Sequence, residues 1–477
     1  MLRVSDLWRW DGTIDRGPYV LLGALCFVVK HAVDRLVAAL VFSRPWQLWS
    51  YLLAPEKAMR AAFVGREDAV FWAVMVALAL PFIWIGVVLT LRRLRSVGLP
   101  TGLLAVFFVP FLNLVMFAVL CVLPARLAGN ATSTQHPGPF HAALGRVIPD
   151  HPVGSAAMAL LLTVPFGVLA TILGTTFLET YGWGVFVGLP FCLGLASVLL
   201  CGYHRERTYG RCVKVSCISV LLLGASLVAL PIEGVICLVM AMPLGMILAM
   251  MGGSIGYVLQ DCRWTRSQAT TVCMVLVFVS PTLMGIEHLS GPEADLLAVR
   301  TSVDVDAPRE VVWRHVIRFP DIPEPKEWIF RHGVAYPTRA RIEGHGAGAI
   351  RYCEFSTGAF VEPIQVWDEP ELLRFSVASR PDPMRELTPY AVLRPPHLDG
   401  SLRSEGGQFL FVPLAGGRTR LEGTTWYRNH IWPSRYWQAW SDLIIQRIHL
   451  RVLRHIKTLA EQDARTGRTE GQGSRGG

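Results

Sequence analysis

Long apolar runs fill the first 290 residues of the chain, whereas the remaining residues alternate between polar and apolar positions. A helix needs about 20 apolar residues to cross a bilayer, because the hydrocarbon offers its backbone no hydrogen-bond partners. Six runs reach that length: 68–92, 153–177, 182–202, 213–231, 233–256 and 270–290. The pattern predicts a multi-span α-helical membrane domain followed by a soluble domain.

The run 18–42 is long enough to span a membrane but carries charged residues near its middle. Lys30 and Asp34 are four residues apart and share one helical face, where an ion pair lowers the cost of immersion. Two interpretations stay open: an internal polar site that serves function, or a pair that faces neighbouring helices or the interface. The second interpretation requires only helix packing.

The run 101–123 is interrupted at its centre by Pro110 and Asn113. If this run enters the membrane and returns, nearly all the positive charges of the short loops lie on one side, which is the usual cytoplasmic bias. We therefore predict a re-entrant hairpin and about two spans within 1–125, and about five spans within 126–292. Seven crossings from a cytoplasmic N-terminus place the rest of the chain outside the cytoplasm.

The polar third of the chain has the periodicities of a soluble domain, predicted over 297–463. Residues 301–308 alternate with period two, as a strand does, and 309–319 then place apolar residues at helical spacing. Pro308 suits the start of that helix, because its missing N–H would have had no partner there. Six further strands follow between turn residues: 334–344, 349–358, 360–369, 372–381, 406–417 and 418–429.

A long helix is predicted over 435–462, and Pro433 separates it from the last strand. One apolar stripe recurs along it at steps of three or four residues and requires a partner surface: Trp437, Trp440, Ile444, Ile448, Val452, Ile456 and Leu459. This order of elements predicts an α+β helix-grip domain, in which a curved antiparallel sheet wraps around the long C-terminal helix. The polar, glycine-rich segment 464–477 is predicted to be a disordered tail.

Two segments of this domain resemble a known superfamily. SVDVDAPREVVWRHVIRF (302–319) is similar to the opening of SRPBCC domains, and GRTRLEGTTWYR with YWQAWSDLIIQRIHLRVLRHI resembles their last strand and closing helix. The superfamily includes START lipid-transfer domains, plant allergen-like ligand carriers and polyketide cyclases. The resemblance covers about 298–463. It implies a cavity between sheet and helix that accepts an apolar or amphipathic ligand.

We expect the ligand-binding residues of that cavity to be mostly aromatic, since aromatic side chains supply large rigid surfaces. The candidates are Trp328, Arg351, Tyr352, Phe355, Trp367, Phe375, Phe409, Glu422, Trp426, Trp440 and Ile444. Each aromatic residue also has an ordinary core explanation. Arg351 and Glu354 fall on opposite faces of their strand, so one of them points inward. Arg420 and Glu422 share a face, which is either the cavity or an exposed surface.

The N-terminal region resembles a second, smaller family. RWDGTIDRGPYVLLG (9–23) and RRLRSVGLP (92–100) are similar to a small bacterial inner-membrane family of unknown function. Arg95 and Ser96 stand where that family has a His-Asp pair. The resemblance covers about the first 125 residues. It implies no activity.

Composition supports the membrane assignment and narrows the function. The chain is 52% hydrophobic and 17% charged, with a mean hydropathy of +0.40, unlike an average soluble domain. Its formal net charge of +9 lies in short clusters between apolar runs, which is typical of membrane loops rather than of a nucleic-acid surface. His449 lies one step off the apolar stripe without an evident carboxylate partner, and Cys353 stands alone in the soluble domain.

Two motifs have simpler explanations than chemistry. GGSIG (252–256) matches the nucleophile elbow of serine hydrolases, but that elbow follows a strand. Inside an apolar helix, Gly252 and Gly256 instead form a small-residue face for a neighbouring helix. One cluster has residue types found at zinc sites at a spacing that fits no common site: Cys201, His204, Cys212 and Cys217. We predict no metal and no cofactor.

The leading hypothesis is a membrane-anchored protein that binds or transfers a lipid, quinone or polyketide-like ligand in the helix-grip cavity. Cyclase or hydrolase chemistry in the same cavity is an alternative, which two or more converging ionisable side chains would favour. A third hypothesis is a transporter or sensor regulated by the soluble domain, with polar residues meeting near Lys30 and Asp34. The predicted partners are the lipid bilayer and an apolar small molecule, and the predicted location is the inner (plasma) membrane.

Overall fold

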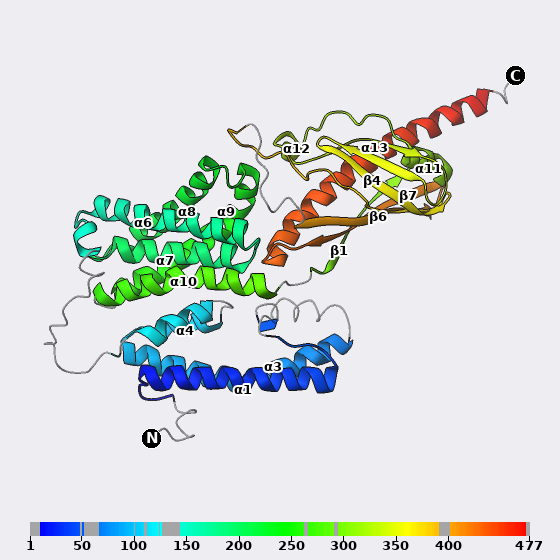
Figure 1. Cartoon of the computed structure of the whole chain (residues 1–477). Helices are drawn as coiled ribbons and strands as arrows, with labels where there is room; N and C mark the ends of the chain where they lie inside the picture. The colour runs from blue at the N-terminus through cyan, green and yellow to red at the C-terminus, as the bar shows by residue number, and fades with distance from the viewer. Residues whose placement is uncertain are drawn as a thin grey trace. The chain divides into compact units, whose positions relative to one another are not determined.

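The computed structural model of the protein describes residues 10–47, 50–51, 66–99, 101–108, 112–123, 125, 144–261, 266–290, 294–390 and 401–473. The chain divides into two compact units. The first consists of Met1–Ser226 and Met242–Gly291, and the second of Leu227–Ala241 and Pro292–Gly477 (Figure 1).

Helices make up the first unit. The elements up to residue 290 are α1 (Arg16–Phe42), α3 (Arg66–Val97), η2 (Thr101–Phe108), α4 (Leu112–Val122), α6 (Pro152–Ile172), η3 (Leu173–Phe177), η4 (Gly184–Gly188), α7 (Leu189–Cys201), α8 (Tyr209–Ala229), α9 (Val235–Asp261) and α10 (Arg266–Ser290). Among the described residues, six helices are long and apolar enough to cross a membrane: Val70–Val97, Pro152–Phe177, Gly184–Cys201, Tyr209–Ala229, Val235–Gln260 and Thr271–Leu289.

Many large apolar side chains on these helices are exposed, among them Leu161, Leu169 and Phe278. Exposed apolar surface of this extent is typical of a protein that contacts a membrane. The prediction of a multi-span α-helical membrane domain is confirmed.

The predicted ion pair of α1 forms. Lys30 contacts the carboxylate of Asp34, and the Tyr51 hydroxyl donates to Asp34 Oδ2 at 2.7 Å. Asp34 is completely buried, so its charge faces protein rather than solvent. Lys30 and Tyr51 thus offset the cost of burying the Asp34 carboxylate, as immersion of a charged group requires.

The run 101–123 does not form one long helix in the described residues. It contains η2 of 8 residues and α4 of 11 residues, both shorter than a span requires. Pro110 lies outside the described residues, and the side of the membrane on which each loop lies stays a prediction.

Arg93 is a completely buried charge at the end of α3. It donates to the backbone oxygens of Leu120 at 3.0 Å and Ile14 at 3.2 Å. The carbonyls at a helix end lack partners within the helix, so a guanidinium satisfies several of them at once. Arg93 therefore joins the N-terminal segment, α3 and α4 rather than serving as a free loop charge.

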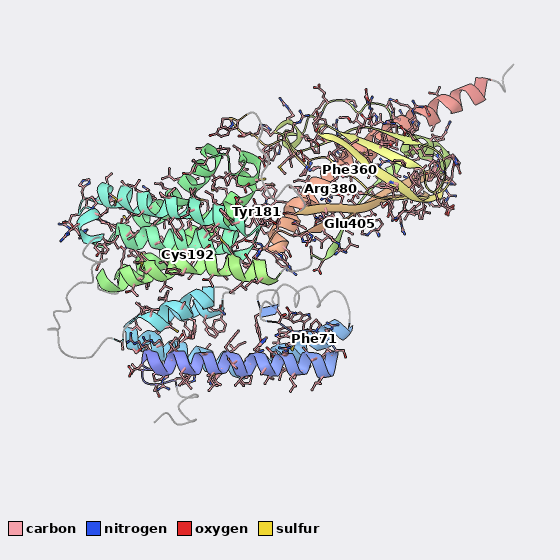
Figure 2. All side chains as sticks on the ribbon, in the orientation of Figure 1. Phe71, Tyr181, Cys192, Phe360, Arg380 and Glu405 are labelled. Atoms are coloured by element: carbon pink, nitrogen blue, oxygen red, sulfur yellow. The ribbon has the colours of Figure 1, made fainter. Side chains whose placement is uncertain are left out.

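Glycines allow α7 and α9 to approach closely. A Cβ on Gly252 would lie 2.3 Å from the Phe191 oxygen, and a Cβ on Gly256 would lie 2.8 Å from the Val198 side chain. GGSIG therefore packs helices together, as the small-residue interpretation predicts. Most residues of α7 are buried, among them Cys192 (Figure 2).

The second unit contains one antiparallel sheet of seven strands in the order β1-β7-β6-β5-β4-β3-β2. The strands are β1 (Leu296–Val305), β2 (Pro337–Glu343), β3 (Ile350–Phe355), β4 (Gly358–Asp368), β5 (Leu372–Ser376), β6 (Leu402–Leu414) and β7 (Arg418–Asn429). The helices are α11 (Arg309–Ile317), α12 (Trp328–Arg331) and α13 (Ser434–Gly473). The predicted helix-grip fold is confirmed, and only the short α12 was not predicted.

The core of the second unit lies between α13 and one face of the sheet (Figure 1). Leu373 and Leu421 on the strands are completely buried, as is Ile456 on α13. Trp313 of α11 is also completely buried, with its ring centre 5.2 Å from that of Phe411. The alternation of strand residues places every second side chain in this core.

Helix α13 runs to Gly473 and so extends into the segment 464–477, which the sequence predicts to be a disordered tail. Once a helix is nucleated, each added residue gains a hydrogen bond, so a polar segment continues it in the absence of a strong breaker. The structure thus describes a helix up to Gly473, and disorder of the segment 464–477 stays a prediction.

The second unit also includes the turn between α8 and α9. The Glu386 carboxylate accepts from Ile236 N at 3.1 Å, and the Leu387 oxygen accepts from Val235 N at 3.1 Å. The first N–H groups of a helix have no partner within it, and a carboxylate there also interacts favourably with the helix dipole. The segment around Glu386 therefore caps the start of α9.

Truncation of Trp313 to alanine is expected to destabilise the second unit by about 3–5 kcal/mol, because it removes a completely buried ring from the core. Hydrogen–deuterium exchange of β1 and β7 in the full chain in detergent measures this cost. Trp328→Ala is the matched control, since that ring is 66% exposed, and its effect should stay within about 0.5 kcal/mol. Equal effects of the two variants would contradict the assignment of the core.

Candidate functional site

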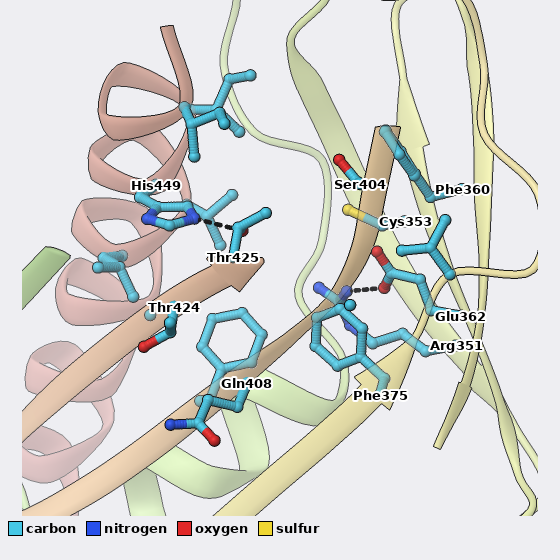
Figure 3. Close-up of a pocket in the computed structure, with 18 of the residues that line it drawn as sticks. Arg351, Cys353, Phe360, Glu362, Phe375, Ser404, Gln408, Thr424, Thr425 and His449 are labelled. Carbon is cyan, nitrogen blue, oxygen red and sulfur yellow. Dashed lines mark hydrogen bonds and ion pairs between the residues drawn. The ribbon is translucent and has the colours of Figure 1, made fainter. Parts of the chain in front are cut away.

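A cavity of about 130 Å³ lies between α13 and the inner face of the sheet in the second unit (Figure 3). Its walls come from β3 to β7 and from one face of α13. The lining residues are Arg351, Cys353, Phe355, Phe360, Glu362, Phe375, Val377, Ser404, Gly406, Gln408, Phe409, Gly423, Thr424, Thr425, Ile445, Ile448, His449, Val452 and Leu453. Mostly apolar walls with a few polar groups are typical of small-molecule sites.

A buried ion pair forms one wall of the cavity. Arg351 of β3 and Glu362 of β4 are paired in the strand register, and the guanidinium contacts the carboxylate (Figure 3). The two residues are 2% and 6% exposed. The guanidinium also lies over two rings, 5.0 Å from the centre of Phe375 and 5.4 Å from that of Phe409. Cation–π contacts of this kind strengthen when solvent is excluded.

Strand alternation explains why Arg351 is inside and Glu354 is outside. Residues one apart on a strand point to opposite faces, so residues 351 and 353 share the inner face while Glu354 lies on the outer one. Glu354 pairs there with Arg339 at 2.7 Å. On β7, Arg420 pairs with Asp304 at 2.8 Å on the outer face, so the exposed interpretation of Arg420 is confirmed.

Burial and the close contact between the two groups shift the pKa values of the ion pair. It raises the pKa of the Glu362 carboxyl above its ordinary value, and the neighbouring guanidinium opposes that rise. Burial also lowers the pKa of Arg351, but attraction to Glu362 outweighs it and the net pKa is raised.

Burial raises the pKa of the Cys353 thiol to about 12. The thiol is therefore protonated at neutral pH and is a poor nucleophile, since thiolate is the reactive form. Among the residues that the structure describes, no three His, Cys, Asp or Glu side chains lie close enough to hold a metal ion.

His449 of α13 faces the cavity opposite the ion pair (Figure 3). Its Nε2 lies 2.7 Å from Thr425 Oγ1, and its Nδ1 lies 3.1 Å from Thr301 Oγ1. Burial lowers the pKa of the imidazole to about 4. The side chain is therefore neutral at pH 7, and the two threonines fix its ring.

Four of the eleven predicted ligand-binding residues line this cavity: Arg351, Phe355, Phe375 and Phe409. Their contact with a ligand stays a prediction. The other seven are not among the lining residues: Trp328, Tyr352, Trp367, Glu422, Trp426, Trp440 and Ile444.

The positions of those seven have simple physical reasons. Tyr352 and Trp426 lie on the outer face, where the Arg341 and Arg374 guanidinium groups cover their rings at 4.3 Å and 5.6 Å. Glu422 is next to the buried Leu421 and so shares that outer face. Trp328 is exposed, and Trp367 packs in the core against Trp313. Trp440 and Ile444 are half-buried on α13.

Fifteen of the lining residues were not predicted as site residues, among them Cys353, Phe360, Glu362 and His449. Cys353 lies two residues from Arg351 on β3 and therefore shares its inward face. Glu362 is the register partner of Arg351 on β4, and the sequence does not show this pairing. His449 is one step off the predicted stripe, yet the face of α13 toward the cavity includes Ile445 and Leu453, which also lie one step off it, beside the stripe residues Ile448 and Val452. The offset by one residue is enough to bring the imidazole inside.

Solved structures are similar to about a third of this chain. A point mutant of norcoclaurine synthase from Thalictrum flavum, in complex with a transition state analogue, is 13% identical with a TM-score of 0.24; the match covers 36% of this chain and 98% of that one. The Zhui aromatase/cyclase from Streptomyces sp. R1128 is 12% identical with a TM-score of 0.23, covering 35% and 95%. A protein from Nitrosospira multiformis is 19% identical with a TM-score of 0.22, covering 35% and 99%.

These low identities and TM-scores assign no activity, ligand or partner to this chain. No protein-family model matches the chain, and no curated protein matches it. The resemblance of the first 125 residues to an inner-membrane family therefore stays a prediction.

The second unit should become less stable as the pH falls, because His449 resists protonation in the folded chain. Its pKa is about 4 in the folded chain against an ordinary 6.5, so the unfolded chain binds the extra proton between these values. The contribution is complete above pH 6.5 and is lost as pH falls toward 4. Between pH 7 and pH 5 the wild type should lose roughly 2 kcal/mol more than His449→Gln.

Hydrogen–deuterium exchange of β7 and α13 in the full chain at the two pH values measures this difference. The other titrating groups are present in both proteins and cancel in the comparison. A wild type and variant with the same pH dependence would refute the role assigned to the neutral imidazole.

Proposed function

We propose that this protein is a membrane-embedded binding protein for a small apolar or amphipathic molecule, held in the cavity between α13 and the sheet. The proposal rests on the presence of this cavity. It has aromatic and aliphatic walls and a small number of fixed polar groups.

The size of the cavity limits the part of the ligand that it encloses. A cavity of about 150 Å³ with apolar walls accommodates benzene, and this one measures about 130 Å³. It is also partly open to the surface. A ring-sized group therefore fits inside, and any longer chain of a lipid or quinone extends through the opening.

The membrane unit would keep such a binding site close to its ligand. Apolar molecules partition into the bilayer, and a binding domain on the same chain as six membrane-crossing helices stays close to that reservoir. Tethering raises the effective concentration of the site relative to its ligand without any new contact. We place the binding domain outside the cytoplasm, following the distribution of loop charges.

Enzymatic chemistry is the second candidate, because four ionisable side chains line one cavity: Arg351, Cys353, Glu362 and His449. Their environments favour binding over catalysis. An imidazole with a pKa of about 4 is a weak base near neutral pH, where a catalytic base works best with a pKa near 7. The Glu362 carboxylate is already paired with Arg351.

A cavity-filling substitution tests the binding function. Gly423 lines the cavity from β7, and a Cβ there would meet Leu453 at 3.7 Å, an ordinary contact distance. Gly423→Leu should occupy the hollow, whereas Gly423→Ala should leave most of it open. After exposure to membrane extract and transfer into nanodiscs of one defined phospholipid, the full chain is denatured and the released small molecules are measured by mass spectrometry.

The wild type and Gly423→Ala should release an apolar molecule that Gly423→Leu lacks. The same molecules in the same amounts from all three proteins would overturn the proposal. A molecule released only in a chemically altered form would favour the enzymatic candidate instead.

A further inference from the structure

We infer that the second unit rests on the bilayer through an apolar patch beside the turn between α8 and α9, and that phospholipid covers this patch. The patch consists of Leu230, Trp328, Leu387 and Tyr390, whose exposed fractions lie between 40% and 66%. Large apolar side chains that gather on a surface in this way mark an interaction site. The inference concerns how the chain meets the membrane, and it holds whichever molecule the cavity binds.

The turn beside the patch lies where two apolar helices end. Tyr209–Ala229 of α8 and Val235–Gln260 of α9 are each long enough to cross a membrane, so the turn between them belongs at the level of the lipid headgroups. Two such helices, α9 and α10, separate this turn from β1. Two crossings return the chain to the side from which it started. The second unit therefore emerges at the membrane surface on which this turn lies.

Hydrogen bonds hold part of the patch at the ends of both helices. The Tyr390 hydroxyl donates to the backbone oxygen of Ala229, the last residue of α8. The backbone oxygen of Leu387 accepts from Val235 N, at the start of α9, at 3.1 Å. Leu387 and Tyr390 thus stand beside the point where the apolar helices end, with side chains 42% and 40% exposed.

The short helix α12 is joined to the same place. Arg385 N donates to the backbone oxygen of Gly333 at 2.8 Å. A Cβ on Gly333 would lie 3.0 Å from the side chain of Ile236, in the first turn of α9. The backbone oxygen of Trp328 accepts from His332 N at 3.1 Å, so one helical turn joins the indole to this contact. The most exposed ring of the patch therefore belongs to an element that packs on the start of α9.

The chemistry of the patch suits the headgroup region of a bilayer. Tryptophan and tyrosine are enriched there, because each has an apolar ring and a polar group. The side chains of Arg331 and Arg385 are exposed next to Trp328 and Leu387 in the chain, and cations of this kind attract lipid phosphates. A protein partner at this position would have to displace the lipid that surrounds the ends of α8 and α9. Phospholipid is therefore the occupant that the position favours.

Contact through the patch also sets the distance between the cavity and the bilayer. The Tyr436 hydroxyl, in the first turn of α13, donates to the backbone oxygen of Met240 in α9. Ile445 is the first residue of α13 that lines the cavity, roughly 14 Å further along the helix. The patch would thus hold the cavity close to the membrane surface instead of letting the second unit swing away from it.

Photocrosslinking from lipid tests the patch in the full chain. The protein is placed in nanodiscs of phosphatidylcholine, part of which carries a diazirine near the glycerol backbone, and crosslinked peptides are identified by mass spectrometry. Peptides that contain Trp328, Leu387 and Tyr390 should carry the label, as should the ends of α8 and α9.

The turn 415–417 between β6 and β7 is the internal control. Near this turn Arg420 pairs with Asp304, whose backbone oxygen accepts a hydrogen bond from Lys457 of α13. Lys457 lies roughly 30 Å further along α13 than Tyr436. The control turn should therefore remain unlabelled, although its residues are exposed.

A double substitution tests whether the apolar side chains make the contact. Trp328→Gln with Leu387→Gln removes two exposed apolar groups and leaves the backbone oxygen of Leu387 in place. Labelling of the patch peptides should fall at least about tenfold, because burial of these groups in lipid supplies most of the attraction. Ala415→Gln on the control turn is the matched variant and should be labelled like the wild type. Unchanged hydrogen–deuterium exchange of β7 in all three proteins shows that the second unit stays folded.

The possible outcomes separate this inference from the binding function. Equal labelling of the patch and the turn 415–417 in the wild type would overturn the inference, and so would a label on the patch that persists in the double variant. A patch that stays unlabelled while the ends of α8 and α9 react would also overturn it and would favour a protein partner. None of these results depends on the cavity, which the Gly423→Leu experiment tests by itself.

Discussion

The contact of α13 with the inner face of the sheet is the constraint on which the second unit depends. Toward its C-terminal half the helix packs closely, with Leu453 and Ile456 almost inaccessible to solvent. Beside Leu453 the helix faces Gly423 of β7, where a Cβ would lie 3.7 Å from the Leu453 side chain. Gly423 brings no side chain to the cavity, where a large apolar residue would fill part of it.

The Arg351–Glu362 pair is the second defining feature of the cavity. A buried ion pair contributes little to stability in general, since the cost of removing two charges from water offsets their attraction. Here the pair also holds the guanidinium over Phe375 and Phe409. The pair therefore places fixed polar groups in the wall of the cavity.

The unit that contains the apolar helices also pairs its buried charges within the protein. Its buried charges are compensated inside the protein, Asp34 by Lys30 and Tyr51, and Arg93 by backbone carbonyls. Its helices approach one another through glycine, as Gly252 does against α7. In both units, several charged groups buried by folding have a partner that the fold itself supplies.

The sequence by itself determined the elements and the class of the fold. Strand, helix and bilayer geometry impose periods of two and of three to four residues and a minimum length on apolar runs. These patterns can therefore be recognised in the sequence alone. The sequence did not determine which residues of the strands face inward. Arg351 and Glu354 are equally good candidates until strand pairing fixes their faces, and Glu362 and His449 become site residues only through neighbours 11 to 148 positions away. Only the tertiary structure decided the cavity, because register and helix rotation depend on the packing of the whole sheet against α13.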